Sequence, residues 1–324
     1  MKIKRQTCCR WIVPVLAGGI FFTPSLFLIA KEKRAGNGSS GKGGKDGGAP
    51  VWVSPASRQL PPGTSYKTFH SKEVGGEVSY FVYLPPSYNR ESTRRYPILY
   101  WLHGSGGNAE KGTDFIEVLH DAIGKGKAPE MIVVLLNGLK VSMWVDHTNG
   151  KQPVESYVTR DMIPYIDQEY RTIGAREGRW IEGFSMGGYG AAHYAFKHPE
   201  LFGAVTEMAG ALLDWEAFEG MGVHEIFGTR ERFEAESPFS LAEKNLQAIK
   251  GNMLVRVIIG DKDNGKQNLL SARDLMGSVP YDLFDVVRRG TSSPNLQIGF
   301  SKLTQGANGQ ATFQIRCITR WGGS

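Results

Sequence analysis

The sequence predicts an α/β fold, in which a mostly parallel central sheet is flanked by helices. Residues 96–102 and 131–136 are apolar throughout, as expected of parallel strands that are covered on both faces. Segments that can form helices, at 112–124 and 154–170, alternate with such strands, and this alternation indicates βαβ units. Further strands are expected at 78–84, 179–182, 202–208, 254–259 and 281–287, and further helices at 189–196 and 267–276.

The basic charge of the chain is confined to its start. Residues 1–50 carry nine Lys and Arg residues against Glu32 and Asp46, a net charge of +7, so the remaining residues carry −1 of the total of +6. A nearly neutral body does not suggest a nucleic-acid partner, and the basic start indicates a targeting segment. The 324 residues, 41% of them hydrophobic, allow residues 51–324 to form one large domain.

An uncharged, mainly apolar run occupies residues 11–30. Basic residues precede it, and Lys31 to Arg34 close it. At about 1.5 Å per residue, a helix of this length can cross a bilayer core. We expect export across a membrane, with residues 1–30 acting either as a cleaved signal peptide or as a membrane anchor, so that the protein is secreted, periplasmic or tethered. Residues 31–50 are rich in Gly, Ser and Lys and predict a flexible linker.

The cysteines carry no chemistry that the pattern can identify. Cys8 and Cys9 precede the apolar run, and Cys317 stands alone in the body of the chain. This spacing predicts neither a disulfide framework nor a metal site. We expect no cofactor and no metal.

The motif that organises the chain is Gly183-Phe184-Ser185-Met186-Gly187. It stands between the strand expected at 179–182 and the helix expected at 189–196, which is the context of a nucleophile elbow. The two flanking glycines allow a sharp turn that leaves the hydroxyl of Ser185 exposed at its tip. A serine that only caps the following helix is the alternative. The strand–turn–helix context favours the nucleophile.

A second glycine-rich loop follows the strand at 96–102 and reads His103-Gly104-Ser105-Gly106-Gly107. Acyl transfer needs donors that stabilise an oxyanion. We expect one from the backbone N–H of Met186, directly after the nucleophile, and a second from the N–H of Ser105 or Gly106. Together the two loops indicate an α/β-hydrolase.

A triad also needs an acid and a base. Asp263 follows the strand at 254–259 and is the predicted acid, in preference to Asp261, which would brace the turn; surface aspartates in a turn are the alternative. The histidines are residues 70, 103, 120, 147, 193, 198 and 224, so none follows Asp263. Residues 288–296 offer no base, because arginine stays protonated. His147 and His224 are the substitutes to examine, and His103 is expected to be structural.

At these residues the chain resembles the putative-esterase family of α/β-hydrolases, which includes esterase D, feruloyl and acetyl-xylan esterases and mycolyltransferases. The resemblance covers roughly residues 63–276 and rests on the segments 81–88, 96–104, 161–167, 183–191 and 198–202. It implies Ser185 as nucleophile, Asp263 as triad acid, and backbone donors at Met186 and after His103. The family's histidine has no counterpart, since Ser293-Pro294 stands where it is expected. Natural loss of catalysis or an altered reading frame near the end would account for this.

The function that follows is that of a serine carboxylic-ester hydrolase. It would form an acyl-Ser185 intermediate from acylated carbohydrate or another small ester. A catalytically impaired, esterase-like binding protein is the first alternative, because the base is missing. An acyltransferase is the second, because water and an alcohol compete for the same acyl-enzyme. The long segment 212–244, which contains several aromatic residues, is expected to form a small helical cap beside the active site.

Overall fold

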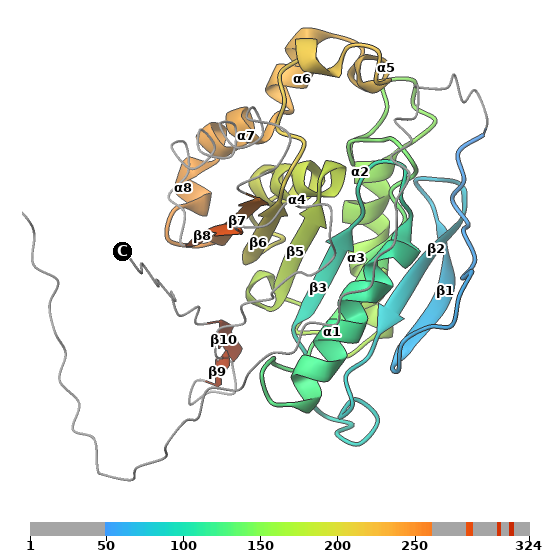
Figure 1. The fold of residues 1–324 in the computed structure, drawn as a ribbon, viewed down its shortest axis with the longest axis vertical. Coiled ribbons are helices and arrows are strands. Elements are labelled where there is room, and N and C mark those ends of the chain that lie inside the picture. The colour runs from blue at the N-terminus through green and yellow to red at the C-terminus, as the bar shows by residue number, and fades with distance from the viewer. Residues whose placement is uncertain (1–48, 261–282, 288–302, 306–310, 314–324) are drawn as a thin grey trace, which may run out of the picture. The chain divides into compact units, whose positions relative to one another are not determined.

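Eight strands form the central sheet of the computed structural model, in the order β1-β2-β4-β3-β5-β6-β7-β8 (Figure 1). The structure describes residues 49–260, 283–287, 303–305 and 311–313. The strands of this sheet are β1 (Thr64–Ser71), β2 (Gly76–Tyr83), β3 (Ile98–Leu102), β4 (Ile132–Leu136), β5 (Arg179–Phe184), β6 (Ala204–Met208), β7 (Leu254–Gly260) and β8 (Leu283–Val287). A second sheet pairs β9 (Leu303–Gln305) with β10 (Ala311–Phe313).

The sheet is parallel from β4 to β8, and only β1 and β2 run antiparallel to their neighbours. The predicted mostly parallel sheet is therefore confirmed, and a strand is present at each predicted position. The sequence did not predict β1. It lies at the sheet edge and pairs only with β2, so exposed polar residues such as Lys67 and His70 interrupt its apolar pattern.

Helices cover both faces of the sheet. α1 (Thr113–Gly124) packs on the face that carries Leu99 and Trp101. α2 (Val154–Ser156), the π-helix η2 (Tyr157–Met162), α3 (Ile163–Glu169) and α4 (Met186–Lys197) pack on the opposite face, which carries Tyr100 and Leu102. Successive side chains of β3 thus enter different cores, which explains why it is apolar throughout. The helices predicted at 112–124, 154–170 and 189–196 are confirmed. Short 3₁₀ turns, η1 (Ala109–Gly112) and η3 (Arg176–Gly178), precede α1 and β5.

The chain between β6 and β7 is helical (Figure 1). It contains η4 (Glu216–Phe218), α5 (Val223–Phe227), α6 (Arg230–Ala235), α7 (Pro238–Lys244) and α8 (Leu246–Ile249). Phe233 is the centre of its core, with ring centroids of Trp215, Phe218 and Phe227 at 5.5, 5.8 and 5.1 Å. The helical character predicted for 212–244 is confirmed, and its role as a cap over the active site stays a prediction.

Several predictions fall on residues outside the described part of the chain. They are the targeting segment at 1–30, most of the linker at 31–50, the helix at 267–276 and the acid Asp263. Among the residues that the structure does describe, no helix is both long and apolar enough to span a membrane.

Candidate active site

Ser185 lies between β5 and α4 in a strained backbone conformation. Its φ of 57° and ψ of −118° fall outside the regions that residues with a side chain favour, at a cost of about 1–3 kcal/mol. Backbone hydrogen bonds hold it there: Ser185 N–H donates to the Met208 carbonyl at 2.9 Å, and the Ser185 carbonyl accepts from Ala211 N–H at 3.1 Å. The end of β6 and the residues that follow it therefore hold the predicted elbow in place.

The two glycines of the motif are required by close approach of the backbone. A Cβ atom at Gly183 would lie 2.1 Å from the Gly187 carbonyl oxygen, and one at Gly187 would lie 2.1 Å from the Leu102 carbonyl oxygen. The second contact joins the elbow to the end of β3. The elbow and the loop that begins at His103 are consequently packed directly against each other.

The predicted oxyanion loop, which begins at His103, passes beside Ser185. A Cβ atom at Gly104 would be 3.3 Å from Ser185 Cβ. Gly106 N–H donates to the Lys140 carbonyl at 2.8 Å, so this predicted donor is already bonded. No described residue accepts from Ser105 N–H, and Met186 N–H belongs to the first turn of α4, where intrahelical acceptors are missing. Met186 and Ser105 are thus the pair of predicted donors whose N–H groups remain free in the described structure.

His103 is a buried, neutral part of the framework. Its Nε2 accepts from Gly138 N–H at 3.1 Å, and its Nδ1–H donates to the Gly104 carbonyl at 2.9 Å. Burial lowers the pKa of His103 to about 4, although the hydrogen bond to Gly104 opposes that shift. With both ring nitrogens bonded to backbone, His103 holds the loop and is not placed to act as a base.

No described histidine is hydrogen-bonded to Ser185. His147 Nδ1 accepts from Asn149 N–H at 3.1 Å, and burial together with the charge of Arg232 lowers the pKa of His147. His224 donates from Nε2 to the Trp215 carbonyl at 2.7 Å and stacks on that ring, with centroids 3.8 Å apart.

The remaining four histidines have other partners. His70 lies 3.5 Å from a Glu77 carboxylate oxygen, and His120 bonds the hydroxyl of Tyr83. His193 and His198 contact Glu155. The predicted acid Asp263 and its alternative Asp261 lie outside the described residues, beyond the end of β7 at Gly260.

Backbone strain marks one edge of the sheet, a signal that sequence analysis missed. The non-glycine residues with positive φ in the described ranges are Leu139, Met143, Trp144, Ser185 and Ala209. They follow β4, β5 and β6, which are parallel strands ending at the same edge. Such strain gathers at functional sites. Trp144 contacts the predicted oxyanion loop, since its Nε1–H donates to the His103 carbonyl at 3.1 Å.

The sheet order and a strained serine between a strand and a helix define an α/β-hydrolase fold. The chain belongs to the family described as putative esterase, whose model matches residues 71–280.

Curated relatives and solved structures agree with this assignment. Esterase MT1326 of Mycobacterium tuberculosis (strain CDC 1551 / Oshkosh) is 31% identical over 149 residues, which are 45% of this chain and 32% of the relative. An endo-1,4-beta-xylanase/feruloyl esterase of Xylanibacter ruminicola is 31% identical over 42% of this chain and 20% of its own length. The chain thus spans a third or less of these curated relatives. A ferulic acid esterase structure aligns with a TM-score of 0.58 and 26% identity, over 70% of this chain and 90% of the other.

Proposed function

We propose that this protein is a serine carboxylic-ester hydrolase that acts on acylated carbohydrate or another small ester. The observation that carries the proposal is the strained Ser185, which directly precedes Met186 and packs against the loop that contains Ser105. This arrangement suits acyl transfer, which needs a serine held at a sharp turn and backbone N–H groups that are free to stabilise an oxyanion.

The reaction begins with attack of Ser185 Oγ on the ester carbonyl carbon. The carbonyl oxygen gains negative charge and accepts hydrogen bonds from Met186 N–H and Ser105 N–H. The carbon–oxygen bond to the alcohol then breaks, and the alcohol leaves with the proton that Ser185 has lost. Water attacks the acyl-Ser185 intermediate in the second half, which releases the acid and restores the hydroxyl.

The substrate class is supported by the relatives and by the surface beside Ser185. Two proteins similar to this chain are named for feruloyl or ferulic acid ester cleavage, and feruloyl groups are aromatic acyl groups. Phe184, which directly precedes the nucleophile, is 38% exposed, and a Cβ atom at Gly104 would meet its ring at 3.5 Å. An exposed aromatic side chain here favours an apolar or aromatic acyl group.

The expected triad histidine has no counterpart in the sequence, so we expect slow turnover. The same observation supports a second candidate, an esterase-like binding protein. No histidine follows Asp263 in the sequence, and loss of the base can lower turnover by up to about a million-fold. Reactive esters depend least on such a base, so they are the substrates of choice for a first assay. We also propose that the protein works outside the cytoplasm, since residues 11–30 have the composition of an export signal or anchor.

The test compares wild-type protein with Ser185→Ala, using p-nitrophenyl acetate and a fluorophosphonate probe. Turnover and labelling that both disappear in Ser185→Ala establish the nucleophile. Ser87→Ala is the matched control, because Ser87 is a buried serine far from the elbow whose hydroxyl donates to a Glu130 carboxylate oxygen. A folded wild-type protein that shows neither labelling nor turnover would overturn the hydrolase and leave the binding protein as the candidate.

A further inference from the structure

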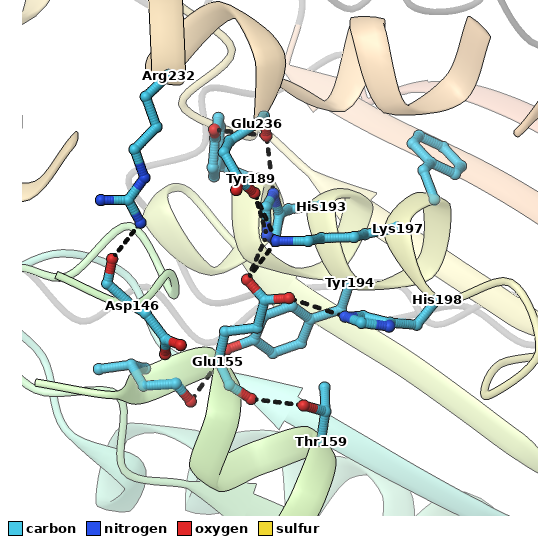
Figure 2. Close-up of polar contacts among 12 residues, drawn as sticks. Asp146, Glu155, Thr159, Tyr189, His193, Tyr194, Lys197, His198, Arg232 and Glu236 are labelled. Carbon is cyan, nitrogen blue, oxygen red and sulfur yellow. Dashed lines mark hydrogen bonds and ion pairs between the residues drawn. The ribbon is translucent and has the colours of Figure 1, made fainter. Parts of the chain in front are cut away.

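A partly buried charged cluster lies at the end of α4 remote from Ser185 (Figure 2). We call it the Glu155 cluster. It consists of Glu155, His193, Lys197, His198 and Glu236. His193 is completely buried, and Glu155 is 7% exposed. Charged groups are rarely buried in this way unless they are paired. The proposed ester hydrolysis does not use any of these side chains directly.

The Glu155 carboxylate accepts hydrogen bonds from three side chains, two on α4 and one on the residue that directly follows it. Glu155 Oε2 accepts from His193 Nε2 at 3.0 Å and from Lys197 Nζ at 2.9 Å, while Oε1 accepts from His198 Nε2 at 2.8 Å. Burial opposes ionisation of Glu155, but the hydrogen bonds from His193 and His198 outweigh it and hold the pKa of Glu155 well below its usual range. Glu155 is therefore an ionised anchor for the far end of α4.

Glu236 closes the cluster from the opposite side. It follows α6, and its Oε2 accepts from Lys197 Nζ at 2.6 Å. Its backbone carbonyl accepts from His193 Nδ1 at 2.8 Å and from the Tyr189 hydroxyl at 3.2 Å. Figure 2 shows Glu155 and Glu236 on either side of the His193 and Lys197 side chains. The cluster thus joins α2, α4 and the end of α6.

Glu155, His193 and Glu236 also present ligand atoms within 4.8 Å of one another, as a metal site would. The ammonium group of Lys197, however, already bonds the same oxygen of each carboxylate. This cation belongs to the chain and already lies between the two carboxylates. The arrangement is that of an ionic junction between helices.

The Glu155 cluster connects the two elements next to the predicted oxyanion donors: α4, which begins at Met186, and the loop after β4. Helix α4 runs from Lys197 back to Met186, one predicted donor. On the other side, Ser156, next to Glu155, donates from its backbone N–H to the Asp146 carboxylate at 2.9 Å. The loop that ends near Asp146 carries the Lys140 carbonyl, which holds Gly106 N–H.

We propose that Glu155 is a positioning residue for the ester-hydrolase site. It fixes α4 relative to the loop after β4, and thereby sets the spacing between Met186 N–H and Ser105 N–H. Donors for a transition state must be held to within about 0.5 Å. A loosened junction changes this spacing, so it affects the transition state more than the binding of substrate. The inference rests on the proposed function.

The variant that tests it is Glu155→Gln, which keeps the side-chain shape but loses the charge that three donors share. We expect kcat for p-nitrophenyl acetate to fall about tenfold with KM unchanged, and labelling of Ser185 to slow equally. The matched control is Asp167→Asn. It breaks another largely buried ion pair, from Asp167 to Arg179 Nη2 at 2.5 Å, at the opposite end of β5. This control loses stability but keeps kcat.

Hydrogen exchange of the α4 amides supplies a readout that is independent of catalysis. We expect these amides to exchange faster in the folded, full-length Glu155→Gln protein than in wild type or Asp167→Asn. Wild-type exchange rates in α4, or a kcat equal to that of the Asp167→Asn control, would overturn the positioning role. If wild-type protein shows no turnover at all, the proposed function fails. Hydrogen exchange then still tests whether Glu155 holds α4 in place. Should Glu155→Gln not fold, Lys197→Met removes one contact to Glu155, and the same two outcomes apply.

Discussion

Ser185 keeps its strained conformation because Gly183 and Gly187 have no side chains, which allows the backbone segments around Ser185 to approach one another closely. One of the two tightest contacts is the one from Gly187 to the Leu102 carbonyl oxygen. A methyl group there cannot move aside, because the opposing atoms are backbone atoms of β3. At the residue scale, the conformation of the predicted nucleophile thus depends on its glycine neighbours.

We expect Gly187→Ala to destabilise the protein by about 2–4 kcal/mol or to prevent folding, because a Cβ at 2.1 Å forces the elbow away from β3. Urea unfolding followed by circular dichroism measures this. Gly124→Ala is the control, since a Cβ there meets no atom within 4 Å. Equal stability of the two variants would contradict the packing described for the elbow.

The oxyanion donors can be tested at Ser105. Ser105→Pro removes the N–H, and we expect the rate of Ser185 acylation to fall about 10²- to 10³-fold. Ser105→Ala keeps the N–H and should retain the wild-type rate, because the proposed contact comes from the backbone. Stopped-flow acylation by p-nitrophenyl acetate separates the two. An unchanged rate in the proline variant would assign the second donor elsewhere.

At the scale of elements, α4 carries both the elbow and the Glu155 cluster. The sequence predicted the elbow from G-x-S-x-G, since that motif has a recognisable spacing. It could not reveal the cluster, because Glu155 and Glu236 come from distant segments that only the fold brings to α4. The spacing of His193 and Lys197, four residues apart on one helix face, was the single local signal.

The helical segment between β6 and β7 depends on one aromatic side chain. Phe233 is 4% exposed and contacts three other aromatic rings. We expect Phe233→Ala to cost about 3–5 kcal/mol and to speed hydrogen exchange in α5 and α6 most. Phe239→Ala, at a partly buried phenylalanine of α7 that packs against the main core, provides the comparison. Uniform loss of protection across the sheet would show instead that the segment unfolds only with the whole domain.

At the scale of the molecule, the parallel sheet was predictable because buried strands are apolar on both faces. The edge strand β1 was not, since its exposed side is polar. The choice between Ser105 and Gly106 also needed the structure, because the bond from Gly106 N–H to Lys140 joins two loops that are far apart in sequence. Asp263 stays a prediction from motif order alone.

The buried carboxylate of Glu110 makes the stability of the fold depend on pH. Glu110 is 8% exposed and accepts from Ser57 Oγ at 2.6 Å and Ser57 N–H at 2.7 Å, which ties the start of the domain to η1. Burial acts to raise the pKa of Glu110, but the hydrogen bonds from Ser57 outweigh it, and the pKa lies below the ordinary 4.5. The folded state therefore binds this proton more weakly than the unfolded chain does.

The sign of the pH effect follows from that difference. The stabilisation by ionised Glu110 is fully present above pH 4.5 and is lost as the pH falls through the lower pKa of the folded state. We expect Glu110→Gln to lower the free energy of unfolding by about 1–3 kcal/mol at neutral pH and by much less in acid. Glu117→Gln, at an exposed position of α1, should match wild type throughout. Urea unfolding from neutral to acid pH measures this, and a constant difference between wild type and Glu110→Gln would contradict the role of the charge.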